Sequence, residues 1–396
     1  MRFAQLRLLR VAVVLAAAVP CAAVDTITFR DRPSPDADPR EITAQGRVLI
    51  EDSVGNRFFE TVDGGRYLIA TDDVLSIESN DTPFRPATAE ELGERLLDEL
   101  PGGWRLHTTP HYAVVYDTSR EYAEWTSSLM EGLYAALQRY WKQQGAEIEE
   151  AEFPLPIVVH RSAADYKQAS EADGVGGAAV GYYNLKNNRV RMFDLTGSDE
   201  LRAAGVAVRR GSRREITRML ATPAAEPLVS TIIHEATHQV CFNTGLMPRL
   251  ADLPLWYVEG MAVYFEAPGS GGARGWSGIG RVNRRRLVTF LRHLGEWNEG
   301  SLASLIASDD RLRDPRTAGV AYADAWALNY YLIHRRRSDY IGYVQAMQQR
   351  EPLKGPPAGE SDAAAARRRI AVFTEHFGDP AELQQEMLQA MSRLRP

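Results

Sequence analysis

A His-Glu-x-x-His pattern beginning at His234 limits what this chain can fold into more than any other feature. Residues four apart on an α-helix lie on one face, so the imidazoles of His234 and His238 can bind the same cation. Glu235 lies one step round the helix, beside the cation but outside its ligand set, where a general base belongs. Apolar residues at helical spacing and Pro227 in a first turn favour a helix over about 227–242. The alternative is a buried helix with two hydrogen-bonded core histidines.

A third protein ligand is expected, because a catalytic zinc site uses three and leaves one position open. Glu259 is the candidate, in a second predicted helix over about 254–266. Twenty residues separate it from His238, enough for the first helix to end and the second to return beside it. Glu266 lies two turns further on and could be an outer partner of the site or a solvent-exposed helix end. We expect the exposed end.

The two helices together resemble a known group of enzymes. His-Glu-x-x-His followed by Trp256-x-x-Glu259-Gly260-x-Ala262 is similar to the gluzincin metallopeptidases, which include thermolysin-like enzymes and aminopeptidases. The stretch from Ile232 to Glu266 resembles still more closely a domain-of-unknown-function family of exported bacterial, peptidase-MA-like proteins. The aminopeptidase signature Gly-x-Met-Glu-Asn is absent upstream, so exopeptidase activity is not supported.

The resemblance extends over about residues 100–345 and implies roles for particular residues. It implies one Zn²⁺ held by His234, His238 and Glu259, with Glu235 as the general base. Gluzincins of the aminopeptidase type also place a tyrosine on a later helix to stabilise the oxyanion. Tyr322, in an apolar segment with helical periodicity, is the candidate here. The alternative for Tyr322 is a core aromatic residue.

Residues 1–23 have the features of an export signal: a basic start, a short apolar stretch and small residues before a cleavage point. Pro20 directly before Cys21 argues against a lipoprotein anchor. No later apolar run is long enough to cross a membrane. We therefore expect a periplasmic or extracellular bacterial protein without a transmembrane segment once the signal is removed. Cys241 would then be the only cysteine, so no intramolecular disulfide can form and we expect its thiol to be buried.

Residues 24–84 predict a small β-barrel-like module similar to SH3-like folds. Short strand-like runs are separated by turn residues, and they occupy 47–51, 57–62, 67–70 and 74–78. This module carries no catalytic cluster. A structural cap is the simplest role for it, and partner binding is the alternative.

Residues 85–396 predict an α+β, zincin-like metallopeptidase domain whose C-terminal part, about 281–396, is mainly helical. Strands are expected around 112–116 and 155–159. By resemblance to zincins, a hairpin over about 182–193 could include the edge strand above the cleft, to which an extended peptide can bind; the alternative is a structural hairpin. The glycine-rich segment 269–280 could act as a lid over the site, or it could be only a connection.

The leading functional prediction is an exported zinc endopeptidase that acts on a peptide or protein substrate. One alternative is a zinc amide hydrolase with a non-protein substrate such as cell-wall peptide. The other is a non-catalytic binding or scaffold protein that retains the metal site. Retention of Glu235 argues against the last, since a structural site needs no base. Lys and Arg number 46 against 52 Asp and Glu, so nothing points to nucleic acid, and no feature predicts an oligomeric state.

Overall fold

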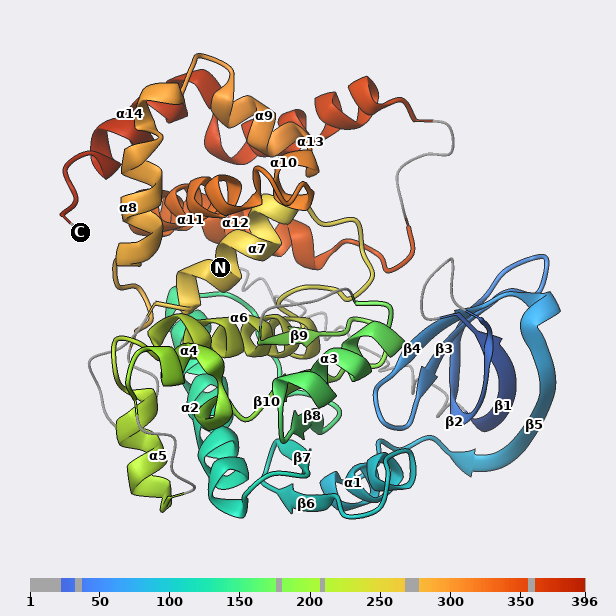
Figure 1. Cartoon of the computed structure of the whole chain (residues 1–396). Helices are drawn as coiled ribbons and strands as arrows, with labels where there is room; N and C mark the ends of the chain where they lie inside the picture. The colour runs from blue at the N-terminus through green and yellow to red at the C-terminus, as the bar shows by residue number, and fades with distance from the viewer. Residues whose placement is uncertain are drawn as a thin grey trace, which may run out of the picture.

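The computed structural model describes most of the chain and shows an α+β fold with a helical C-terminal half (Figure 1). The predicted signal, apart from Ala23, and most of the glycine-rich segment lie outside the described residues. Within the described part, no helix is long and apolar enough to cross a membrane. The described residues are 23–32, 38–175, 180–206, 211–267, 278–354 and 360–395.

The N-terminal β module is a five-stranded antiparallel sheet with the order β4-β3-β2-β1-β5. Its strands are β1 (Ala23–Asp31), β2 (Arg40–Glu51), β3 (Arg57–Thr61), β4 (Arg66–Ile69) and β5 (Val74–Pro83). The strand-like runs in the sequence fall within or close to the last four, while β1 was not predicted. The small core of this module is built around Ile27, Phe29 and Phe59. Strands β4 and β5 form the two edges of this sheet, so the described strand pairs do not close it into a barrel. The likeness to SH3-like barrels therefore stays a prediction.

A second sheet, with the order β6-β7-β8-β10-β9, supports the rest of the molecule. Its strands are β6 (Arg105–Thr108), β7 (Tyr112–Tyr116), β8 (Leu155–His160), β9 (Gly181–Tyr183) and β10 (Val190–Phe193). The three inner strands are parallel and wholly buried, as expected for a sheet covered on both faces. The strands predicted around 112–116 and 155–159 are confirmed as β7 and β8. The hairpin predicted over about 182–193 contains β9, which is an edge strand of this sheet.

Successive side chains of each strand point to opposite faces of this sheet, and helices cover both faces. On β7, Ala113 and Val115 join a cluster with α1 (Ala89–Asp98), whereas Val114 faces the main core. That main core holds α2 (Arg120–Gln144) and the helices of the C-terminal half. The third covering helix is α3 (Ala163–Ala172), which packs on β8 and β10.

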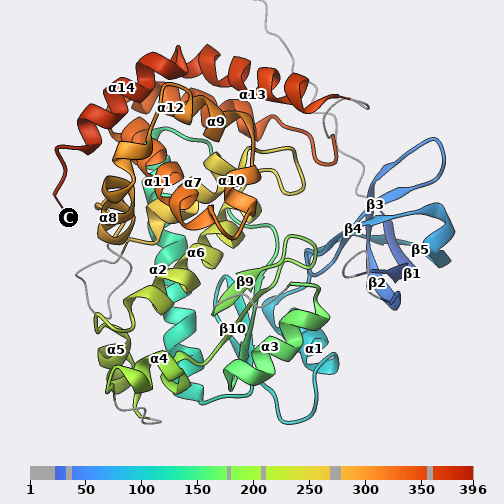
Figure 2. The same ribbon diagram turned by 45° about the horizontal axis from the view of Figure 1, so that its top comes forward.

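The C-terminal half stacks helices beyond α6, so one core runs from the sheet to the last helix (Figure 2). The main helices are α6 (Glu226–Asn243), α7 (Leu255–Phe265), α8 (Arg284–Arg292), α9 (Ser301–Ala307), α11 (Ala318–Arg335), α12 (Arg337–Gln348), α13 (Asp362–Phe377) and α14 (Pro380–Met391). Helices α4 (Asp199–Ala203) and α5 (Arg213–Leu220) lie between β10 and α6, and the short α10 (Asp310–Arg313) lies between α9 and α11. The prediction of a mainly helical C-terminal part is confirmed.

Helices α7 and α11 approach so closely at Gly260 that no larger residue fits. A Cβ there would lie 2.0 Å from Asn329 Nδ2 and 2.7 Å from the Ala325 carbonyl oxygen. Asn329 cannot easily move, since its Nδ2 donates to the Trp256 carbonyl at 2.9 Å and its Oδ1 accepts from Tyr340 at 2.6 Å. Gly260 therefore fixes how α7 sits on α11.

Gly260→Ala is expected to destabilise the fold by about 1–3 kcal/mol or more, because an overpacked core must shift its helices. Urea unfolding followed by circular dichroism measures this. Gly319→Ala on α11 is the control, because nothing lies within 4 Å of a Cβ at that position. Equal stability of the two variants would contradict the proposed close packing.

Candidate metal centre

Helices α6 and α7 bring three potential metal ligands to one point. His234 and His238 lie one turn apart on α6, and Glu259 faces them from α7. The two Nε2 atoms are 3.1 Å apart. Glu259 Oε2 lies 3.1 Å from the Nε2 of His234 and 3.4 Å from that of His238. The three residues expected from the sequence to bind a metal therefore converge.

The spacing of these atoms fits a small divalent cation. Ligand atoms placed about 2.0–2.1 Å from a tetrahedral zinc ion are about 3.3 Å from one another. The observed separations of 3.1, 3.1 and 3.4 Å agree with that triangle. Two nitrogens and one carboxylate oxygen also form the donor set of one class of catalytic zinc site. The residues present therefore fit the metal that the sequence predicts.

The prediction that Glu266 is an exposed helix end is wrong. It is only 2% exposed, and its Oε2 lies 3.2 Å from His234 Nδ1. Its Oε1 accepts from Asn283 Nδ2 at 3.0 Å and from Arg286 Nε at 2.9 Å. The start of α8 thus covers the end of α7. A proton held on Nδ1 by Glu266 leaves Nε2 of His234 free to bind a metal.

The electrostatics of this site favour a positive charge at its centre. Burial works against protonation of His234, but the carboxylates of Glu259 and Glu266 outweigh it and raise the pKa of His234. Burial raises the pKa of Glu266, but His234 and Arg286 outweigh this effect and lower the pKa to about 2. Carboxylates held ionised around a buried imidazole stabilise a cation there, whether a proton or a metal ion.

Glu235 is held beside the ligands by the edge strand of the sheet. Its Oε2 accepts the backbone N–H of Tyr183, on β9, at 2.8 Å. Burial raises the pKa of Glu235, the direction that brings a carboxylate closer to the working range of a general base. This N–H of β9 is therefore engaged by Glu235, and peptide binding along the rest of the edge stays a prediction.

Tyr322 reaches the same site from α11. Its ring centroid is 6.0 Å from that of His234, and the Arg286 guanidinium lies 5.4 Å from the Tyr322 ring centroid. Burial, and then the nearby Glu259 carboxylate, raise the pKa of Tyr322, so its hydroxyl remains a proton donor at neutral pH. Arg286 contacts both Glu266 and Tyr322. Neither Arg286 nor Tyr183 was predicted from the sequence to be a residue of this site.

Residues 228–354 match a family model described as "Protein of unknown function (DUF1570)". The match begins in α6 and ends just after α12, so it includes both histidines, Glu235, Glu259 and Tyr322. No curated protein matches the chain. The match agrees with the resemblance to a domain-of-unknown-function family and names no peptidase.

Glu266→Gln is expected to weaken metal binding by about 10–100-fold, as is typical when the partner of a ligating histidine is replaced. Competition with a chromophoric zinc chelator gives the affinity. Glu299→Gln, at an exposed position outside the site, serves as the control. Unchanged affinity in Glu266→Gln would mean that Glu266 does not support His234.

Proposed function

We propose that this protein is a zinc-dependent peptidase in which Glu235 acts as the general base. The observation that carries the proposal is the convergence of His234, His238 and Glu259 with the Glu235 carboxylate held beside them. Three protein ligands leave a coordination position open, whereas structural zinc sites usually close all four with protein groups. Hydrolysis requires a base beside an open coordination position, whereas a structural metal site requires neither.

Each residue of the site has a distinct part in the proposed reaction. A zinc ion held by His234, His238 and Glu259 would acidify water and polarise the scissile carbonyl. Glu235, oriented by the Tyr183 N–H, takes the proton from the attacking water and delivers it to the leaving nitrogen. The Tyr322 hydroxyl donates to the oxygen that gains negative charge.

Tyr322→Phe is expected to lower turnover by about 10²–10³-fold, the usual effect of removing one oxyanion donor. Metal content should stay unchanged, because Tyr322 is not a ligand. Peptide cleavage and metal analysis on the same preparation measure both quantities. Tyr330→Phe on the same helix is the matched control, and full turnover in Tyr322→Phe would assign this tyrosine to the core.

Digestion of casein and of a peptide library by the mature chain tests the proposed function. We expect cleavage inside the peptides that a chelator abolishes and added Zn²⁺ restores. A parallel digest of cell-wall peptides identifies the alternative substrate class. Cleavage restricted to those non-protein substrates, or none of either class by metal-loaded protein, would contradict the peptidase proposal.

A further inference from the structure

The hairpin of β9 and β10 contacts the general base proposed above. At the end of β9, the Tyr183 N–H donates to Glu235 Oε2 at 2.8 Å. The next N–H along the chain, that of Asn184, points into the hairpin and donates to the Arg189 carbonyl at 2.9 Å. Because the N–H groups of an edge strand alternate in direction, that of Tyr183 points out of the sheet. The position of Glu235 therefore depends on how this three-residue strand is held.

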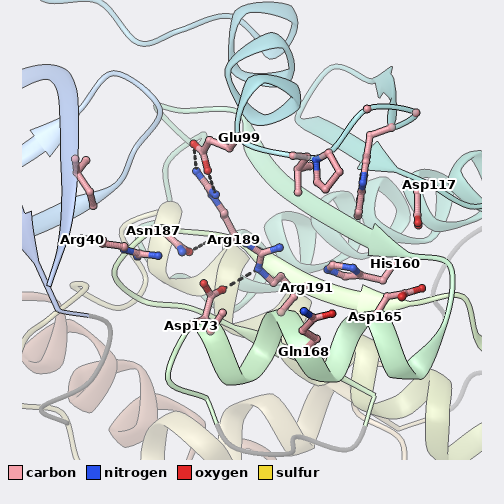
Figure 3. A pocket seen from close by; sticks show the side chains of 18 of the residues that line it. Arg40, Glu99, Asp117, His160, Asp165, Gln168, Asp173, Asn187, Arg189 and Arg191 are labelled. Atoms are coloured by element: carbon pink, nitrogen blue, oxygen red, sulfur yellow. Dashed lines mark hydrogen bonds and ion pairs between the residues drawn. The ribbon is translucent and has the colours of Figure 1, made fainter. Parts of the chain in front are cut away.

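Residues 184–189 form the turn of this hairpin, and both the β module and α1 hold it in place. The Arg66 N–H, at the start of β4, donates to the Lys186 carbonyl at 2.7 Å. The Arg189 side chain makes two bonds of 2.5 and 2.7 Å to Glu99, the residue that ends α1 (Figure 3). The turn is therefore fixed to parts of the chain that precede it by about a hundred residues.

Asn188 binds this turn to the helix that carries the two histidines. Its side-chain amide exchanges two hydrogen bonds, of 2.7 and 2.9 Å, with the amide of Asn243 on α6. Its backbone carbonyl accepts from the Nε2 of Gln239, which directly follows His238, at 2.8 Å. The Tyr183 hydroxyl donates to Asn188 Oδ1 at 2.8 Å. Asn188 thus fixes β9 and the metal-binding helix relative to each other.

Arg249 connects the β module to Tyr183. Its Nη2 donates to the Gly64 carbonyl at 2.6 Å. Burial raises the pKa of Tyr183, and the charge of Arg249, with its hydrogen bond to the Tyr183 side chain, acts against that rise. Arg249 is buried, and its Nε and Nη1 have no hydrogen-bond partner among the described residues. Burial of an incompletely paired charge is costly, so Arg249 adds little to the stability of the fold.

Gly64 is the point at which the β module lies closest to this hydrogen-bond network. Its φ is +79°, and a Cβ there would lie 3.0 Å from Phe153 and 3.3 Å from Asn188 Nδ2. A larger residue would therefore strain the turn of the module and press on Asn188. Gly55 has a similar φ of +85° in another turn of the module, but a Cβ there would meet only Thr71. The two glycines thus form a matched pair.

We propose that Arg249 is a positioning residue, through which the β module holds Tyr183 and thereby Glu235 beside the metal ligands. The proposal rests on the proposed role of Glu235 as the general base. A base must lie within hydrogen-bond reach of the proton it takes, and misplacement by about 1 Å can lower a rate about 10²-fold. Arg249 is too deeply buried to touch a substrate, so its effect must pass through its neighbours.

Hydrogen exchange of the Tyr183 amide tests the proposal without any measurement of activity. Selective labelling with ¹⁵N-tyrosine makes this amide visible, and its signal is the one missing from Tyr183→Phe. In the zinc-loaded mature chain, Arg249→Met and Gly64→Ala should each speed this exchange at least about fivefold, the effect of weakening one hydrogen bond. Glu235→Gln should exchange normally, since its amide oxygen can still accept the Tyr183 N–H.

Peptide cleavage and zinc competition on the same variants complete the test. Arg249→Met and Gly64→Ala should each lower kcat at least about tenfold, while KM and zinc affinity stay unchanged. Gly55→Ala is the matched control and should alter neither the exchange rate nor kcat. Faster exchange in a chain that cleaves no peptide would support the positioning of Glu235 and contradict only the peptidase proposal.

Three results would overturn the proposed role of Arg249. The first is an unchanged Tyr183 exchange rate in Arg249→Met. The second is equal acceleration in Gly55→Ala, which would show that any strain in the β module has the same effect. The third is an unchanged kcat in variants of an active chain whose Tyr183 amide exchanges faster.

Discussion

Glu235→Gln is expected to lower peptide hydrolysis by about 10²–10⁴-fold or more, which corresponds to about 3–5 kcal/mol of transition-state stabilisation. Glutamine keeps the shape of the side chain but cannot accept and pass on a proton. Its amide oxygen can still accept the Tyr183 N–H, so the position of the side chain should be preserved. The measurement is the rate of cleavage of a defined peptide under saturating Zn²⁺.

Metal content distinguishes the loss of a base from the loss of the site. Glu235 is outside the triangle formed by His234, His238 and Glu259, so the Glu235→Gln variant should bind as much zinc as the unmodified chain. Glu226→Gln, at the start of the same helix, controls for charge removal and should retain full activity. More than a tenth of the original rate in Glu235→Gln would assign the base to another residue.

His234→Ala should remove both metal and activity. The substitution deletes the nitrogen that lies 3.1 Å from both His238 Nε2 and Glu259 Oε2. It also removes the side chain that contacts the buried Glu266 carboxylate at 3.2 Å, and an unsatisfied buried polar group costs about 1–3 kcal/mol. We expect zinc affinity to fall more than about 100-fold, beyond the loss from replacing an outer partner.

Competition with a zinc chelator and urea unfolding measure the two effects of His234→Ala separately. His334→Ala, at an exposed position on α11, is the control and should leave both quantities unchanged. Near-normal zinc affinity in His234→Ala would show that the metal binds elsewhere.

The metal centre was largely predictable because its geometry is local. A four-residue spacing on a helix fixes the relation of His234 to His238. The short connection to α7 leaves Glu259 few places other than beside them. Tyr322 is different, since its position depends on how α11 packs on α7, and Gly260 governs that contact. Only the resemblance to a known family drew attention to it.

The error at Glu266 arises from contacts made at a distance in sequence. Its partners Asn283 and Arg286 are the N-cap and an early residue of α8, which follows α7 after a long connection. A glutamate at the end of an apolar helix is more often solvated than buried. Its seven-residue spacing from Glu259 did place it on the same face, but that pattern does not show which residues cover it.

The junction between the β module and the rest of the chain also could not be predicted. Arg249 is only 1% exposed, although arginine is among the residues least often buried. Its Nη2 donates to the Gly64 carbonyl at 2.6 Å, across the junction. From the sequence, a structural cap was the simplest role for the β module and partner binding the alternative, and neither prediction indicated this contact.

The metal content of the purified mature chain tests the central claim most directly. After zinc loading and dialysis, elemental analysis should find about one zinc ion per chain in the unmodified protein and in Glu235→Gln. His234→Ala should hold essentially none. A chain that retains no zinc, or a zinc ion that remains after His234→Ala, would contradict the assignment of His234, His238 and Glu259 as the ligands.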